Sequence, residues 1–145
     1  MKGAVVDSSV IVKLVLKEEA SAEAEATVLR LLEEGGTAST TEVALPEAAN
    51  AVWKRARLMR KLGRADYRRA VGSLILLFSR FRLVPTVEIA EAAAELAFGE
   101  GITFYDSLYL AAAERLGVRL VTADRRLHDA ARGRIESTLI GRSKD

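Results

Sequence analysis

Short runs of apolar and β-branched residues alternate along this chain with longer segments of helical periodicity, and this alternation constrains the fold more than any other feature. Intervening helices return the chain so that successive strands lie parallel, and such strands are usually covered on both faces. The pattern therefore predicts an α/β fold with a central, mostly parallel sheet. The expected strands are residues 3–6, 37–40, 83–84, 118–122 and 135–140.

The segments between these strands carry start and stop signals of helices. Ser21 is a good N-cap for a helix over residues 22–34, and Gly35 follows it. Thr86 is expected to cap a helix that runs to residue 98. The other expected helices are 9–16, 46–60, 65–81 and 103–116, with a short helical turn at 125–131.

Length and composition are typical of one globular unit. The chain has 145 residues, 50% hydrophobic and 29% charged, with no linker, repeat or low-complexity segment. No stretch is apolar over the length of a membrane span, and Asp7 interrupts the first apolar run before a signal-peptide core forms. We therefore expect a single domain over residues 1–145 in a soluble, cytoplasmic protein with no membrane partner.

Four residue types are absent or occur once, which limits the possible chemistry and bears on the source of the protein. The chain has no cysteine, which excludes disulfides and thiolate metal sites, and one histidine makes zinc a poor candidate. It has no glutamine and a single asparagine, Asn50. Depletion of thermolabile amides favours a thermophilic source, although a GC-rich genome can produce the same bias.

Four acidic residues stand where core elements end or begin. Asp7 directly follows the first expected strand, and Asp124 lies two residues beyond the strand at 118–122. Glu47 and Asp106 stand at expected helix starts. Ligands of open parallel sheets bind at the carboxyl ends of the strands, so we expect these side chains to share one crevice.

Such a group of carboxylates needs compensation. Two like charges about 4 Å apart repel by about 4 kcal/mol at an effective dielectric constant of ~20, against a domain stability of roughly 5–15 kcal/mol. Mg²⁺ or Mn²⁺ would relieve this repulsion, because hard cations take oxygen ligands. One or two such ions can activate water and stabilise charge on a phosphodiester, which makes metal-assisted cleavage the natural chemistry.

Each acid also has an interpretation that requires no metal. Asp7 and Asp124 can cap the helices that follow them. Glu47 can be a solvated acid favoured by a helix dipole, and Asp106 matches a capping box that begins at Thr103. Singly, these alternatives compete with metal binding, so the hypothesis depends on the four acids occurring together.

The segments around the acids read Val-Val-Asp7-Ser-Ser, Pro-Glu47-Ala-Ala-Asn-Ala-Val-Trp, Thr-Phe-Tyr-Asp106-Ser-Leu-Tyr-Leu-Ala-Ala-Ala and Leu-Val-Thr-Ala-Asp124-Arg-Arg-Leu. In this order they resemble the motifs of PIN domains, above all VapC-type toxins of toxin–antitoxin modules, over nearly the whole chain. The resemblance implies a three-layer α/β/α sandwich, Mg²⁺- or Mn²⁺-dependent ribonuclease activity, a homodimer and a cognate antitoxin. It also implies that these four acids are the catalytic and metal-binding residues.

Polar neighbours of the acids are candidates for orienting them. Asn50 lies three residues after Glu47, so both share a helix face, and its amide can orient a carboxylate or a water. Ser8 and Thr122 flank acids and can hold water or substrate. For all three residues, an ordinary polar contact or a local turn hydrogen bond is an alternative interpretation.

Basic residues concentrate in segment 54–69, which carries eight Lys and Arg against one acid. Such a block can contact RNA, or it can be a solvated helix face whose side-chain stems cover apolar surface. The candidate substrate contacts are Lys54, Arg55, Arg57, Arg125 and Arg126.

Several aromatic residues and the lone histidine lie near these segments. Trp53, Tyr105 and Tyr109 could stack on bases, but core or interface packing is the preferred interpretation. We assign no role to His128.

The leading hypothesis is a metal-dependent endoribonuclease that acts on RNA as the toxin of a toxin–antitoxin pair. The alternative is a catalytically silent module with the same fold that binds a protein or RNA partner without cleaving. Two other classes fit less well. Haloacid-dehalogenase-like phosphatases have a further acid two positions after the Asp at the strand end, where this chain has Ser9. Response-regulator receivers have an acidic pair near the first strand, where Asp7 is alone.

Overall fold

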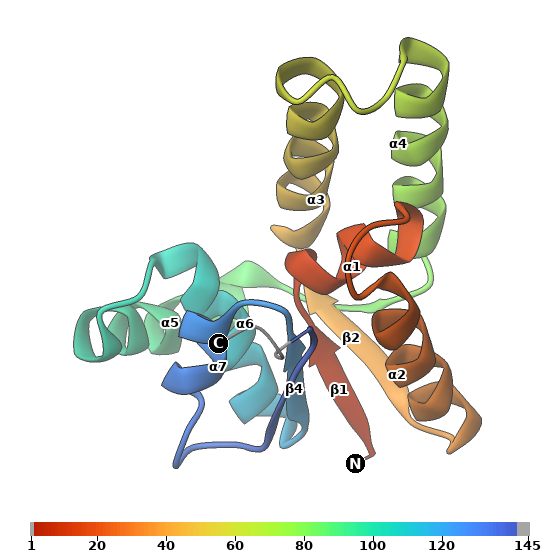
Figure 1. Ribbon diagram of the computed structural model, residues 1–145. Helices are drawn as coiled ribbons and strands as arrows, with labels where there is room; N and C mark the ends of the chain where they lie inside the picture. Colours follow the sequence, from red (N-terminus) through yellow and green to blue (C-terminus); the bar gives the residue numbers. More distant parts are fainter. Residues whose placement is uncertain (1, 142–145) are drawn as a thin grey trace.

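The computed structural model describes residues 2–141, and a five-stranded sheet runs through the centre of the protein (Figure 1). The strands are β1 (Gly3–Val6), β2 (Thr37–Thr41), β3 (Arg82–Val84), β4 (Arg119–Thr122) and β5 (Ser137–Leu139). Their order in the sheet is β3-β2-β1-β4-β5, and each of these pairings is parallel. The parallel sheet predicted from the alternating pattern is confirmed.

Helices cover both faces of this sheet. They are α1 (Ser8–Val15), α2 (Ser21–Glu33), α3 (Ala44–Trp53), α4 (Arg64–Phe78), α5 (Thr86–Glu100), α6 (Phe104–Leu116) and α7 (Arg125–Ala130). Figure 1 shows α1 and α2 on one side of the sheet and α5, α6 and α7 on the other, while α3 and α4 project together from one end. The three-layer sandwich is confirmed. Within residues 2–141, no helix combines the length and low polarity that crossing a bilayer requires.

The core is built around β1, β4 and α6. Val5, Val6 and Leu120 are fully buried in the two central strands. In α6 the residues from 107 to 113 are all buried, since this helix lies against the sheet on one side and against α5 on the other. Full burial of a side chain such as Leu110 contributes about 1.5–3 kcal/mol. This packing gives the carboxyl ends of β1 and β4 a rigid support.

Two predicted helix caps are wrong. Ser21 is the first helical residue of α2, and its hydroxyl accepts the Glu18 N–H and donates to the Leu16 carbonyl instead. The cap position is Ala20, whose φ of 67° lies in the left-handed region. At α5, Thr86 is likewise inside the helix, and its N–H is bonded by the carboxylate of Glu42 at 2.7 Å.

The predicted helix over residues 46–60 is not uniform. After α3 the chain widens into a π-helical turn, η1 (Lys54–Leu58), in which the Met59 N–H bonds the Lys54 carbonyl at 2.9 Å. Arg55, in this wider turn, bonds Glu18 in the loop between α1 and α2 at 2.6 and 3.1 Å. The ion pair fixes the projecting α3 to the body of the protein.

Candidate metal-binding site

The carboxyl ends of β1 and β4 lie next to each other and bring Asp7 close to Asp124. The Asp7 N–H continues the strand ladder by bonding the Val121 carbonyl at 3.1 Å. Just beyond, the buried Thr122 hydroxyl donates to Asp7 Oδ2 and accepts the Asp124 N–H at 2.9 Å. A single threonine therefore connects the two acids that the neighbouring strands deliver.

Asp7 is the most buried of the four acids, with 4% of its surface exposed. Its Oδ1 accepts hydrogen bonds from Ser9 Oγ at 2.5 Å and from the Val10 N–H at 3.2 Å. Burial raises the pKa of Asp7 to about 6 although these bonds oppose the rise, and the negative charge of Asp124 adds to it. Within residues 2–141, no Lys, Arg or His forms an ion pair with Asp7.

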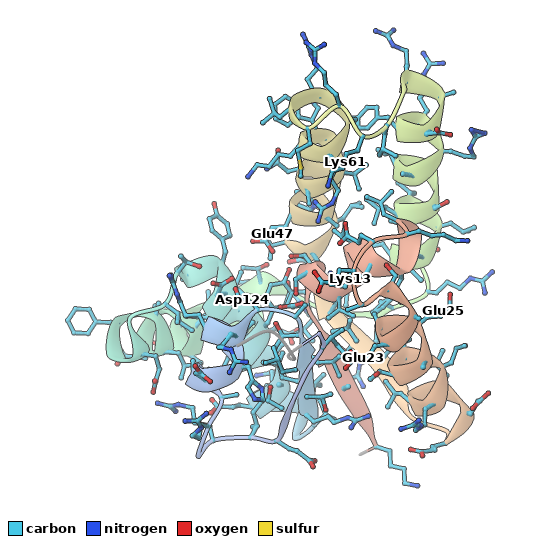
Figure 2. All side chains as sticks on the ribbon, viewed as in Figure 1. Lys13, Glu23, Glu25, Glu47, Lys61 and Asp124 are labelled. Carbon is cyan, nitrogen blue, oxygen red and sulfur yellow. The ribbon has the colours of Figure 1, made fainter. Side chains whose placement is uncertain are left out.

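Glu47 enters the same region from the first turn of α3. Its Oε1 accepts two hydrogen bonds, one from Ser8 Oγ at 3.0 Å and one from the Tyr109 hydroxyl at 2.6 Å. Figure 2 shows Glu47 at the base of α3, and Asp124 at the start of α7. The two donors come from different elements, α1 and α6, so the position of the Glu47 carboxylate depends on both.

Asp106 lies half-buried in the first turn of α6, where its N–H bonds Thr103 Oγ1 at 3.0 Å. Burial raises the pKa of Asp106, and the negative charges of Asp124 and Glu47 raise it further, against the positive charge of Arg126. Asp106 therefore lies within the electrostatic field of two other acids, as Asp7 lies within that of Asp124.

The arrangement fits a divalent cation in its donor chemistry. All four side chains offer carboxylate oxygens, and the raised pKa values of Asp7 and Asp106 reflect burial and repulsion that such an ion would relieve. Within the described part of the chain, however, no three His, Asp or Glu side chains are close enough to hold one ion in their present conformations. Binding would therefore require side chains to change conformation, and Asp106 and Asp124 are the half-buried Asp side chains among the four acids.

The interpretations that require no metal also hold for individual acids. Asp7 caps α1 through its bond to Val10, and Asp124 caps α7, since its Oδ1 accepts the Arg126 N–H at 2.9 Å. The Thr103 side chain caps α6 as the capping box predicts. A cap and a metal ligand are compatible, because capping occupies only some of the lone pairs of a carboxylate.

Some of the polar neighbours predicted from the sequence contact an acid and others do not. Ser8 bonds Glu47 and Thr122 bonds Asp7, so both contact an acid directly. Asn50 is exposed, and its side chain forms no hydrogen bond within residues 2–141. His128 Nδ1 lies 2.7 Å from Ser137 Oγ, a contact between α7 and β5.

The basic candidates lie on two surfaces. Arg125 and Arg126 are exposed in the first turn of α7, beside Asp124. Lys54 and Arg57 are exposed on η1, whereas the Arg55 guanidinium is held by Glu18. The ion pair makes Arg55 a structural residue in this conformation.

Two residues that contact the acids were not predicted to do so. Tyr109 was assigned to packing, although it follows Asp106 by three residues and so shares its helix face. Ser9 donates to Asp7 and accepts the Ala123 N–H at 3.0 Å, which joins the loops after β1 and β4. A hydroxyl two residues after a strand-end Asp was the signal available for Ser9.

The fold and these acids define an α/β protein with acidic side chains at the carboxyl edge of a parallel sheet. The sequence profile of the PIN domain matches residues 4–133, and the chain belongs to the PIN domain family. The resemblance seen in the motifs around the acids is thereby confirmed.

Individual relatives agree with this assignment. Ribonuclease VapC3 of Pyrobaculum aerophilum is 37% identical over 124 residues, which cover 85% of this chain and 90% of that protein. The crystal structure of PAE2754 from the same organism superposes with a TM-score of 0.67 at 29% identity, covering 92% of this chain and 90% of the other. A toxin–antitoxin complex from Klebsiella pneumoniae gives a TM-score of 0.65 at 15% identity, covering 94% and 96%, and supports the fold.

Proposed function

We propose that this chain is a Mg²⁺- or Mn²⁺-dependent endoribonuclease, the toxin of a VapBC-type toxin–antitoxin pair, and that its single PIN domain carries the activity. Membership of the family and the similarity to a protein named as a ribonuclease support this class of activity. The observation that carries the proposal is Asp7, a carboxylate buried beside another acid with no neutralising side chain in the described part of the chain.

In this proposal Asp7, Glu47, Asp106 and Asp124 hold the metal and the reacting phosphodiester between them. A bound divalent ion would supply positive charge at the phosphodiester and would acidify water. Thr122 and Ser9 keep the Asp7 carboxylate in one orientation through their hydroxyl groups. Ser8 and Tyr109 do the same for Glu47.

The basic surfaces have a separate role, which is to attract RNA. Lys54 and Arg57 on η1 follow Glu47 along the chain, and Arg125 and Arg126 on α7 follow Asp124, so positive charge lies close in sequence to two of the acids. Contacts with phosphates release counterions, so binding should weaken as the salt concentration rises. Arg55 adds little to this attraction, because Glu18 holds its guanidinium and compensates its charge.

The test is a cleavage assay with purified protein, structured RNA, and Mg²⁺ or Mn²⁺. Cleavage should require the metal and stop when EDTA is added. Asp7→Asn should abolish cleavage, whereas Asp129→Asn, an exposed acid on α7, should leave it unchanged. End-labelled RNA distinguishes internal cuts from trimming at the ends. Cleavage that survives EDTA, or that Asp7→Asn retains, would exclude the mechanism.

Binding of an antitoxin, self-association and a cytoplasmic location belong to the same proposal. Segment 74–78 of α4 is apolar, and although Leu74 is buried, Ile75 and Leu76 are 55% and 62% exposed. A second protomer or an antitoxin would cover such side chains. Light scattering of the purified chain should give twice the mass of 15.7 kDa if the homodimer forms.

The silent interaction module remains the alternative, because no three carboxylates of the described chain are arranged around one point. Titration calorimetry with Mn²⁺ separates the two hypotheses. A nuclease must take up the ion in the absence of RNA or bind it together with RNA, whereas the silent module needs neither.

A further inference from the structure

A cleft of about 350 Å³ lies at the far end of the projecting pair of helices, away from the sheet (Figure 1). Its walls come from the end of α3, from η1 and from the first turn of α4. Two aromatic residues, Trp53 and Tyr67, line it together with small and apolar residues such as Leu62. Three arginines also line it: Arg57, Arg64 and Arg68. None of these residues belongs to the acidic site.

The arginines of this cleft differ from other arginines of the same basic segment. Arg57, Arg64 and Arg68 are exposed, and within residues 2–141 none of them forms an ion pair or a side-chain hydrogen bond. By contrast, Arg55 bonds Glu18 and Arg69 bonds Asp66. Unneutralised guanidinium groups are therefore concentrated at the cleft, and the ligand that complements them is an anion.

The aromatic side chains of the cleft indicate which class of anion fits it. Trp53 ends α3 with 40% of its surface exposed, which is more than packing in a core would leave. Tyr67 is half-buried on the other wall. Aromatic faces beside guanidinium groups stack on nucleobases while the arginines contact phosphates, and stacking contributes about 1–3 kcal/mol per base. An acidic peptide would satisfy the arginines but leave the aromatic faces without a planar partner.

We propose that this cleft binds an unpaired segment of the RNA substrate, with a base stacked on Trp53 or Tyr67 and neighbouring phosphates on Arg57, Arg64 and Arg68. This inference rests on the proposed ribonuclease function. Trp53 follows Glu47 by six residues on one helix, which corresponds to about 9 Å along its axis. The same six residues make about one and two-thirds turns, so RNA that leaves the acids reaches the cleft by passing around α3, which a flexible single strand can do. The cleft therefore selects substrates with a single-stranded stretch beside the cut.

The experiment uses the fact that Trp53 is the only tryptophan of the chain, so intrinsic fluorescence reports on this cleft alone. An oligouridylate of about ten nucleotides is titrated into the Asp7→Asn protein in EDTA, so that no cleavage occurs. RNA should quench the fluorescence saturably. Contacts with three phosphates of a single strand should give a slope of about −2 in a plot of log affinity against log salt.

Matched variants separate the cleft from general electrostatics. Arg64→Ala/Arg68→Ala removes two charges at the cleft, and Arg30→Ala/Arg80→Ala removes two exposed charges elsewhere. The first pair should weaken RNA binding about tenfold, and the second should change it less than twofold. Trp53→Leu, followed with fluorescein-labelled RNA, should weaken binding about 5- to 150-fold. Circular dichroism melts confirm that each variant is folded.

The outcomes distinguish this inference from the function on which it rests. If the wild-type protein cleaves RNA but RNA leaves the Trp53 fluorescence unchanged, or if both double variants lose affinity equally, the cleft is not an RNA subsite. Quenching by a poly-glutamate peptide but not by RNA would also overturn the inference and assign the cleft to an acidic protein. Quenching by RNA with no cleavage under any metal would support the cleft and contradict the nuclease.

Discussion

Tyr109 on α6 donates its hydroxyl proton to Oε1 of Glu47 on α3 across 2.6 Å. The tyrosine is 1% exposed, and burial together with the Glu47 carboxylate holds the pKa of Tyr109 well above its usual range. The hydroxyl is therefore protonated near neutral pH and can donate to Glu47. Because α6 also carries Asp106, this helix supplies one of the four acids. Through Tyr109 it also fixes the orientation of a second acid, Glu47.

Replacing Tyr109 by Phe should reduce metal binding more than stability. The change removes one of the two donors that orient Glu47 while it keeps the ring in the core. Loss of a partner that orients a metal ligand typically costs 10- to 100-fold in affinity, and we expect the Mn²⁺ affinity measured by calorimetry to fall by about that factor.

The control for this variant is Tyr67→Phe, the same change on α4. It should leave the Mn²⁺ affinity within twofold of the wild-type value, and the two variants should melt within a few degrees of each other. Equal Mn²⁺ affinity of Tyr109→Phe and the wild type would show that the bond to Glu47 is structural only.

The raised pKa of Asp7 predicts how stability depends on pH in the absence of metal. The folded state keeps the proton up to about pH 6, whereas the unfolded chain releases it near the ordinary pKa of an aspartate, 3.8. The folded state thus binds more protons in this window, so the contribution of Asp7 to stability is full below pH 3.8 and is lost as the pH rises through 6. The difference in pKa corresponds to an upper limit of about 3 kcal/mol.

Urea unfolding in EDTA measures this contribution, between pH 4.5 and 7.5, for the wild type and Asp7→Asn. The amide cannot ionise, so the stability of the variant relative to the wild type should increase over this range and level off above pH 7. If the difference in unfolding free energy between the two proteins stayed constant over this pH range, the pKa of Asp7 would not be raised by folding.

Thr122→Val should destabilise the metal-free protein by about 1–3 kcal/mol. The isosteric change leaves Asp7 Oδ2 without its donor and the Asp124 N–H without its acceptor, both in a buried or half-buried setting. Thr122→Ser keeps the hydroxyl and should lose less stability than Thr122→Val. An unfolding free energy in urea for Thr122→Val that equals or exceeds that of Thr122→Ser would show that the hydrogen bonds of the hydroxyl are not the main contribution.

Arg55→Ala should act on stability rather than on RNA. Burial favours a raised pKa for Glu18, but the bonds and charge of Arg55 outweigh it, and the pKa of Glu18 lies below its usual range. The pair is partly exposed, so we expect a loss of about 1 kcal/mol on unfolding. A double-mutant cycle with Glu18→Ala isolates the coupling, while RNA affinity should fall less than it does for Arg57→Ala.

The elements of the fold were predictable because their signals are local. The apolar runs at β1 and β4 and the glycines after α5 and α6 act over a few residues, and Gly101 and Gly117 have the positive φ values of 70° and 68° that such helix ends require. The predicted caps failed because other partners bond the capping hydroxyls: the Ser21 hydroxyl bonds Glu18 and Leu16, and the side chain of Thr86 bonds Glu42.

The sequence by itself determined the parallel sheet, the order of its helices and the candidate acids, because hydrophobic periodicity and the residue types at strand ends are written in short segments. Only the tertiary structure decided which side chains meet. Tyr109 reaches Glu47 across 62 residues of chain, and Arg55 reaches Glu18 across 37. A hydrogen bond requires two atoms within about 3 Å, and only the packing of α3, α6 and the loop before α2 brings those atoms together.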